Sequence, residues 1–172
     1  VLRVATAWRL AASGRGLLLH AAAVEDDDEA LVLLGPSGAG KTTALRLSSP
    51  RPAIADDVVI LTAPRDEAGR WLVHPTPLWA EPRLASRSAR LSPLPLAGVL
   101  RLAQAKRPAV EALSAAAAAA CVLAHAPFAA GGPVVAAHVP ERLARAVPFA
   151  TLRFALDAGF WPAVEAWRAD SR

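Results

Sequence analysis

The sequence is poor in the features that mark disulfide-bonded, membrane-spanning or secreted proteins. Its 172 residues include one cysteine, and no stretch approaches the roughly 20 strongly apolar residues of a membrane span. Cys121 cannot form a disulfide within the chain, and its position after an alanine run favours a buried, inert thiol. The first ten residues lack the charged start, long apolar centre and small-residue cleavage site of a secretion signal. We therefore expect a cytoplasmic protein without a membrane partner.

The chain also lacks a concentrated basic region. It carries 19 Lys and Arg against 15 Asp and Glu, but these are scattered arginines rather than a basic block with interleaved aromatic residues. That pattern is typical of a solvated surface, so we expect no nucleic-acid partner. The length suits one hydrophobic core, and neither a repeat nor a dividing linker is present. The sequence therefore predicts a single domain over residues 1–172.

Short apolar runs alternate with polar turns in the first half of the chain. Strands are predicted at 16–24, 30–34, 52–64 and 71–79, with a short helix at 42–48. The acidic run at 25–29 is interpreted as a solvated hairpin turn rather than a metal site, because no second ligand cluster accompanies it.

The second half of the chain predicts more helix. We expect a strand at 97–105, helices at 109–124 and 141–147, a strand at 149–156, and a last helix carrying Phe160, Trp161, Val164 and Trp167. The aromatic residues of that helix are interpreted as core packing. The arginine-rich stretch 81–92 predicts a surface loop that faces a substrate. Together these elements predict an α/β fold.

One motif carries the chemistry. Residues 35–42, GPSGAGKT, match GxxxxGK[ST] and lie between an apolar strand and a predicted helix, which is the context this phosphate-binding loop requires. Lys41 is expected to reach the β- and γ-phosphates of ATP, and Thr42 to supply a hydroxyl ligand to Mg²⁺. The residues expected to hold the nucleotide are Gly35, Ser37, Gly38, Ala39, Gly40, Lys41, Thr42 and Thr43.

Three further polar residues are candidates for the same site. Asp56 and Asp57 follow a short apolar segment, where the end of a strand would bring them to the Mg²⁺ and the γ-phosphate. The alternative is a pair of solvated turn aspartates. His20 lies in an otherwise apolar strand whose hairpin partner leads into the phosphate loop, although a histidine satisfied by a core carbonyl is the simpler interpretation of that residue alone.

Taken together, His20, the loop GPSGAGKTT and the segment IADDVVIL resemble the HPr serine kinase/phosphorylase family and its shorter relatives. Looser similarity continues through HPTPLWAEP and VPFATLRFALDAGFW. The resemblance implies a compact P-loop α/β domain related to phosphoenolpyruvate carboxykinase, with a mixed sheet flanked by helices. It also implies transfer of phosphate from ATP to a hydroxyl. Because shorter relatives include kinases of ribosomally made peptides, the expected acceptor is a serine of a peptide or protein.

The resemblance further implies a role for each site residue. Lys41 would clamp the phosphates, Thr42 and Asp57 would hold Mg²⁺ with Glu81 as a further contact, and Asp56 would act as the general base, tuned by His20. On the residues alone, which aspartate is the base stays open. So do the oligomeric state and two alternatives to a kinase, namely a non-catalytic ATP-binding module that works with a partner protein and a motor or transport ATPase.

Overall fold

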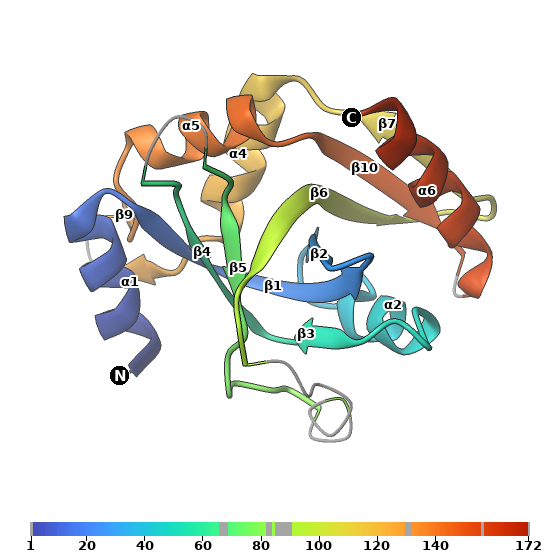
Figure 1. Ribbon diagram of the computed structural model, residues 1–172, viewed down its shortest axis with the longest axis horizontal. Coiled ribbons are helices and arrows are strands. Elements are labelled where there is room, and N and C mark those ends of the chain that lie inside the picture. Colours follow the sequence, from blue (N-terminus) through green and yellow to red (C-terminus); the bar gives the residue numbers. More distant parts are fainter. Residues whose placement is uncertain are drawn as a thin grey trace.

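The computed structural model describes residues 2–65, 69–81, 84, 91–129, 132–155 and 157–171. Figure 1 shows a mixed sheet with helices on both sides. The helices are α1 (Leu2–Ser13), α2 (Lys41–Leu47), α4 (Ala115–His125), α5 (His138–Ala146) and α6 (Trp161–Asp170), with a 3₁₀ turn, η1 (Ala158–Phe160). The strands are β1 (Gly16–Asp26), β2 (Glu29–Leu34), β3 (Ala53–Ala55), β4 (Val58–Thr62), β5 (Leu72–His74), β6 (Leu94–Gln104), β7 (Ala109–Ala112), β8 (Phe128–Ala129), β9 (Gly132–Pro133) and β10 (Phe149–Phe154).

The large sheet runs in the order β2-β1-β4-β5-β6-β10-β7. Strands β2, β6 and β10 are parallel to one another, whereas β1, β4 and β5 pair antiparallel with their neighbours. Since β6 pairs with β5 near its start and with β2 further along, the strands β2, β1, β4, β5 and β6 form a closed circuit of pairings. The parallel strands share one carboxyl edge, the edge where α/β sheets bind ligands.

The predicted hairpin of β1 and β2 is confirmed. Its turn consists of Asp27 and Asp28, which have φ of 53° and 59°, and aspartate is among the few residues other than glycine that adopt this left-handed conformation readily. The turn fixes the register, so that Ala21 pairs with Leu34 at the far end of β2. The start of the phosphate loop therefore lies beside the middle of β1.

Both faces of the sheet are buried. On one face, alternate residues of β1 such as Leu17 and Leu19 pack with Cys121 and Val122 of α4 and with Leu143 of α5. The opposite face packs against α2 and α6, which contribute Leu45, Trp161 and Val164. Figure 1 shows α4 and α5 above the strands and α2 below them. Because helices cover both faces of the sheet, the sequences of β1 and β2 are nearly continuous apolar runs.

The prediction of a buried, unpaired Cys121 is confirmed. Cys121 is a buried free thiol, and burial raises the pKa of Cys121, against a smaller opposing effect of Arg101. Among the described residues no helix has both the length and the apolar character needed to cross a membrane.

Two predictions about elements need correction, and one helix was missed. The segment predicted as one helix over 109–124 begins as β7, paired with β10, and turns helical only after Ser114, whose hydroxyl caps the helix by accepting from the amide of Ala117. The strand predicted at 71–79 is limited to β5, because Pro75 and Pro77 cannot donate to a ladder. Helix α1 was not predicted.

Other predictions lie mainly outside the described residues. The surface loop predicted at 81–92 is described only at residues 81, 84, 91 and 92. The organisation of residues 1–172 as a single domain stays a prediction.

Buried ion pairs join the β1–β2 hairpin to the C-terminal helix. Arg168 of α6 is 8% exposed and pairs with Asp26 and with Glu29, the latter at 2.7 Å. Arg51 also pairs with Asp26, at 2.6 Å. Burial raises the pKa of Glu29, but hydrogen bonds and charges from Arg70 and Arg168 outweigh it and leave that pKa below its ordinary value. The end of the hairpin is therefore held to α6 by charge as well as by packing.

We predict that Arg168→Ala lowers the free energy of unfolding by about 2 kcal/mol, because it removes one of the two arginines that pair with each of Asp26 and Glu29. Urea denaturation at neutral pH measures the change. Arg145→Ala is the matched control, since the Arg145 side chain is 76% exposed and its loss should cost less than about 0.5 kcal/mol. Equal effects of the two substitutions would contradict a structural role for the buried pairs.

Candidate functional site

A glycine-rich loop links the end of β2 to the start of α2. Gly38 and Gly40 have φ of 81° and 100°, a conformation that strongly favours glycine. Gly35 is required for a different reason, because a Cβ at this position would lie 2.6 Å from the Cβ of Ala39. The loop is therefore closed tightly at its base, while Ser37 at its tip is exposed.

The first turn of α2 faces the inside of this loop. Gly40 precedes the helix and supplies no side-chain cap, so the first amides of the helix have no side-chain acceptor and are available to an anion. These amides belong to Lys41, Thr42 and Thr43. The arrangement suits a phosphate group.

Lys41 is folded back against the loop. Its Nζ donates to the carbonyl oxygens of Gly35 at 2.7 Å and Pro36 at 3.3 Å. Burial lowers the pKa of Lys41, whereas the charges of Asp57 and Asp56 act in the opposite direction. The ammonium thus lies between the loop carbonyls and two carboxylates, in a position where a phosphate oxygen can take over as acceptor.

Asp56 forms the buried centre of the site. It is 2% exposed, and it accepts hydrogen bonds from the Thr42 hydroxyl at 2.9 Å and from the amide of Glu81 at 3.1 Å. Burial raises the pKa of Asp56; the two hydrogen bonds act against the rise, and the Glu81 and Asp57 charges add to it. No cationic side chain of the described residues forms an ion pair with this carboxylate.

Asp57 has different partners. Its Oδ1 lies 3.1 Å from Nδ1 of His20, and its Oδ2 pairs with Arg3 of α1. The same His20 nitrogen lies 3.1 Å from the backbone oxygen of Asp57. The resemblance implied that His20 tunes Asp56, and this contact is corrected here to Asp57. The physical reason is the register of β1 and β4, which pairs His20 with Val58, the residue directly after Asp57.

Glu81 donates to Asp56 through its backbone amide, while its side chain pairs with Arg46. Its carboxylate accepts a hydrogen bond from Nε of Arg46 at 2.9 Å and also contacts Nη2 of that residue. The described residues contain no group of three or more His, Cys, Asp and Glu placed to hold a metal ion. The expected metal set of Thr42, Asp57 and Glu81 stays a prediction; in the structure the Thr42 hydroxyl donates to Asp56.

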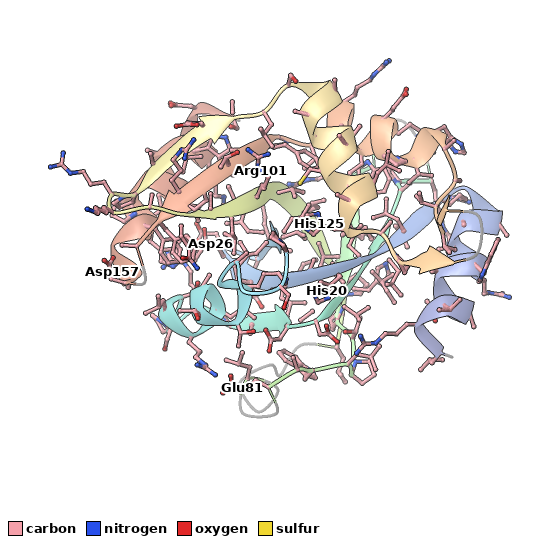
Figure 2. All side chains as sticks on the ribbon, turned by 180° about the vertical axis from the view of Figure 1, so that it is seen from behind. His20, Asp26, Glu81, Arg101, His125 and Asp157 are labelled. Carbon is pink, nitrogen blue, oxygen red and sulfur yellow. The ribbon has the colours of Figure 1, made fainter. Side chains whose placement is uncertain are left out.

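Three residues near the site were not singled out from the sequence. Gln104 of β6 donates to the carbonyl of Gly38 at 3.2 Å and so holds the tip of the loop. Arg101 pairs in register with Leu34, and its guanidinium donates to the Thr151 hydroxyl at 2.8 Å. Arg3 is the third. Figure 2 labels Arg101 on β6 and His20 on β1. The polar residues of the otherwise apolar VLRLAQ were the available signal for Arg101 and Gln104.

Comparison with known proteins gives a family and a fold. A family model described as SynChlorMet cassette protein ScmC matches residues 2–130. The fold is similar to that of the solved Hpr(Ser) kinase/phosphatase from Coxiella burnetii, with a TM-score of 0.50, 12% sequence identity, and coverage of 89% of this chain and 97% of that chain. A search of curated proteins found no match. The predicted α/β fold of the HPr kinase type is supported at the level of the fold.

We predict that Thr42→Val raises the pKa of Asp56 further, because the hydroxyl donates to the ionised carboxylate and its loss disfavours that form. Carbon NMR of aspartate-labelled protein, titrated with pH, measures the shift. The control is Thr43→Val, one position further along the same helix turn. An unchanged or lower Asp56 pKa in Thr42→Val would show that the hydrogen bond is absent in solution.

Proposed function

The chain belongs to the family of SynChlorMet cassette protein ScmC, and we propose that it transfers the γ-phosphate of ATP to a hydroxyl group. The acceptor we propose is a serine of a peptide or protein. One observation carries the proposal. The loop that fits phosphate lies at the carboxyl edge of β2, together with the Thr42–Asp56 pair. The histidine–carboxylate pair of His20 and Asp57 lies at the same edge. A protein that only holds a nucleotide needs the loop but has no use for the histidine–carboxylate pair.

In this proposal the loop and α2 bind the triphosphate. Lys41 exchanges its contacts with the Gly35 and Pro36 carbonyls for oxygens of the β- and γ-phosphates. Backbone amides of the loop and of Thr42 and Thr43 surround the same phosphates. Burial lowers the pKa of Lys41, and a bound polyanion would raise that pKa again by stabilising the ammonium.

Thr42 and Asp56 are the residues that fit Mg²⁺. A buried carboxylate with a raised pKa and no cationic partner among the described residues is a position where a bound cation is favourable. Mg²⁺ takes few protein ligands when phosphate oxygens and water complete its shell, so one hydroxyl and one carboxylate suffice. The ion supplies charge neutralisation of the phosphates. We therefore propose Asp56, rather than Asp57, as the carboxylate on the metal side.

Asp57 is then the proposed general base. The acceptor oxygen attacks the γ-phosphorus, the bond from that phosphorus to the bridging oxygen of ADP breaks, and the hydroxyl proton passes to the Asp57 carboxylate. His20 orients this carboxylate through its contact with Oδ1. The other oxygen is held by Arg3 in the absence of substrate. The arginines of the stretch 81–92, which the sequence predicts to face a substrate, lie outside the described residues.

The contact of Arg3 with Asp57 also supports the alternative of an ATP-binding module without transfer. An arginine that stayed on the carboxylate would lower its basicity and block the approach of a hydroxyl. The two functions differ in what happens to the γ-phosphate after ATP has bound. Binding and transfer must therefore be measured separately on the same variants.

We predict that purified protein with Mg²⁺ and [γ-³²P]ATP labels a serine of candidate peptides encoded beside its gene. Lys41→Ala should abolish ATP binding and labelling together, because it removes the phosphate-binding cation. Asp57→Asn should retain ATP binding and lower labelling by about 100-fold or more, because it removes the base. Asp56→Asn should weaken the dependence of ATP binding on Mg²⁺.

The controls use the same substitutions away from the site. Lys106→Ala and Asp170→Asn change exposed residues and should leave binding and labelling unchanged. Tight ATP binding without label on any acceptor would establish the binding module instead. Labelling that survives in Asp57→Asn but not in Asp56→Asn would return the role of base to Asp56.

A further inference from the structure

A second concave site lies apart from the phosphate loop. It is a cavity of about 700 Å³ between the β4–β5 connection, the start of β6 and the carboxyl ends of α5 and α6. Glu29, the first residue of β2, is part of its wall. Cavities of this size are in the range that proteins use to bind small molecules.

The cavity is not an extension of the ATP site. Glu29 begins β2 and Leu34 ends it directly before the loop, and five residue steps of an extended strand span about 17 Å. The cavity thus opens at the amino edge of the parallel strands, whereas the phosphate loop lies at their carboxyl edge. Figure 2 shows the two parts of the hairpin apart from each other. Asp26 lies at the end of β1 next to the turn, and His20 lies nearer the start of that strand.

The wall of the cavity is strongly basic. Arg70 and Arg168 lie in it but are already paired with Glu29. Arg65 and Arg142 line it as well, and in the described part of the chain neither has an ion-pair or hydrogen-bond partner. Arg65 and Arg142, which have no carboxylate partner among the described residues, therefore add positive charge to the cavity wall beside Arg70 and Arg168, and this charge favours an anionic occupant.

The floor of the cavity is apolar. Trp167 contributes to it, together with the small exposed parts of Trp71 and Leu96, which are 3% and 4% exposed. A Cβ at Gly98 would lie 2.6 Å from Cη2 of Trp167, so the absence of a side chain there lets the indole ring lie directly on β6. Aromatic rings and a leucine provide a surface for the face of a planar group.

We propose that this cavity binds a small organic anion, a planar apolar body that carries a carboxylate or a phosphate. The planar body rests on Trp167 beside the buried Trp71, and the anionic group meets the guanidinium groups of Arg65 and Arg142. Bidentate guanidinium contacts suit both carboxylate and phosphate oxygens. The proposal stands apart from the kinase assignment, since none of these residues contacts the phosphate loop or the aspartates.

The test uses three probes with the same ring: benzoate, phenyl phosphate and the neutral benzyl alcohol. Calorimetry and ligand-detected NMR measure their binding to the wild type and to Lys41→Ala, in which the phosphate loop is disabled. We expect both anions to bind more tightly than benzyl alcohol, and to do so equally in Lys41→Ala. The tighter of the two anions identifies whether the natural ligand carries carboxylate or phosphate.

Reversing the charge of single arginines in the cavity wall shows where the anions bind. Arg142→Glu and Arg65→Glu should each weaken binding of the anions by about tenfold or more, with little effect on benzyl alcohol. Arg145→Glu is the matched control on the same helix, because Arg145 is exposed and is not part of the cavity wall. Circular dichroism confirms that the variants are folded.

Three results would overturn the proposal. They are no anion binding by the wild type, loss of that binding in Lys41→Ala, and equal weakening by Arg142→Glu and Arg145→Glu. The second result would mean that the anions bind only at the phosphate loop. Loss of kinase activity in Lys41→Ala with the anion affinities unchanged would show that the two sites are independent.

Discussion

The register between β1 and β2 is the constraint on which the candidate site depends. The two-residue turn at Asp27 and Asp28 aligns Ala21 with Leu34, and this alignment brings His20 next to the strand that runs into the phosphate loop. A shift of one residue would move every side chain of β1 to the opposite face of the sheet. Buried apolar residues on both faces make such a shift costly, so the hairpin fixes the position of the chemistry.

Adjacent aspartates are given separate environments by the same geometry. Asp56 points to α2 and is buried with a hydroxyl and an amide as partners, whereas Asp57 points to β1 and meets His20 and Arg3. Neighbouring carboxylates that share one site raise each other's pKa. The two carboxylates have different partners, although the Asp57 charge still adds to the rise in the pKa of Asp56. In the proposed kinase, this difference would give one carboxylate to the metal and the other to the proton.

The two edges of the parallel strands carry different kinds of positive charge. At the carboxyl edge, the charge is a single lysine and the amides of a tight loop, which suits a chain of phosphates. At the amino edge, it is a set of arginines around tryptophan rings, a combination suited to a planar anion. Arg168 belongs to both the wall of this cavity and the ion pairs that hold α6 to the hairpin, so the second site is built on part of the framework of the fold.

The sequence by itself determined the hairpin, the loop and most strands, because each depends on a local pattern: apolar runs, glycines at fixed spacing, and turn residues. It misplaced the start of α4, since the short strand β7 is stabilised by β10 and by packing against α6 rather than by the propensity of its own residues. It also did not predict α1, whose Arg3 reaches Asp57 across 54 positions of the chain. The tertiary structure alone decided which aspartate contacts Thr42 and which contacts His20. It also decided where the arginines lie around Trp167. These contacts join residues that no local pattern in the sequence connects.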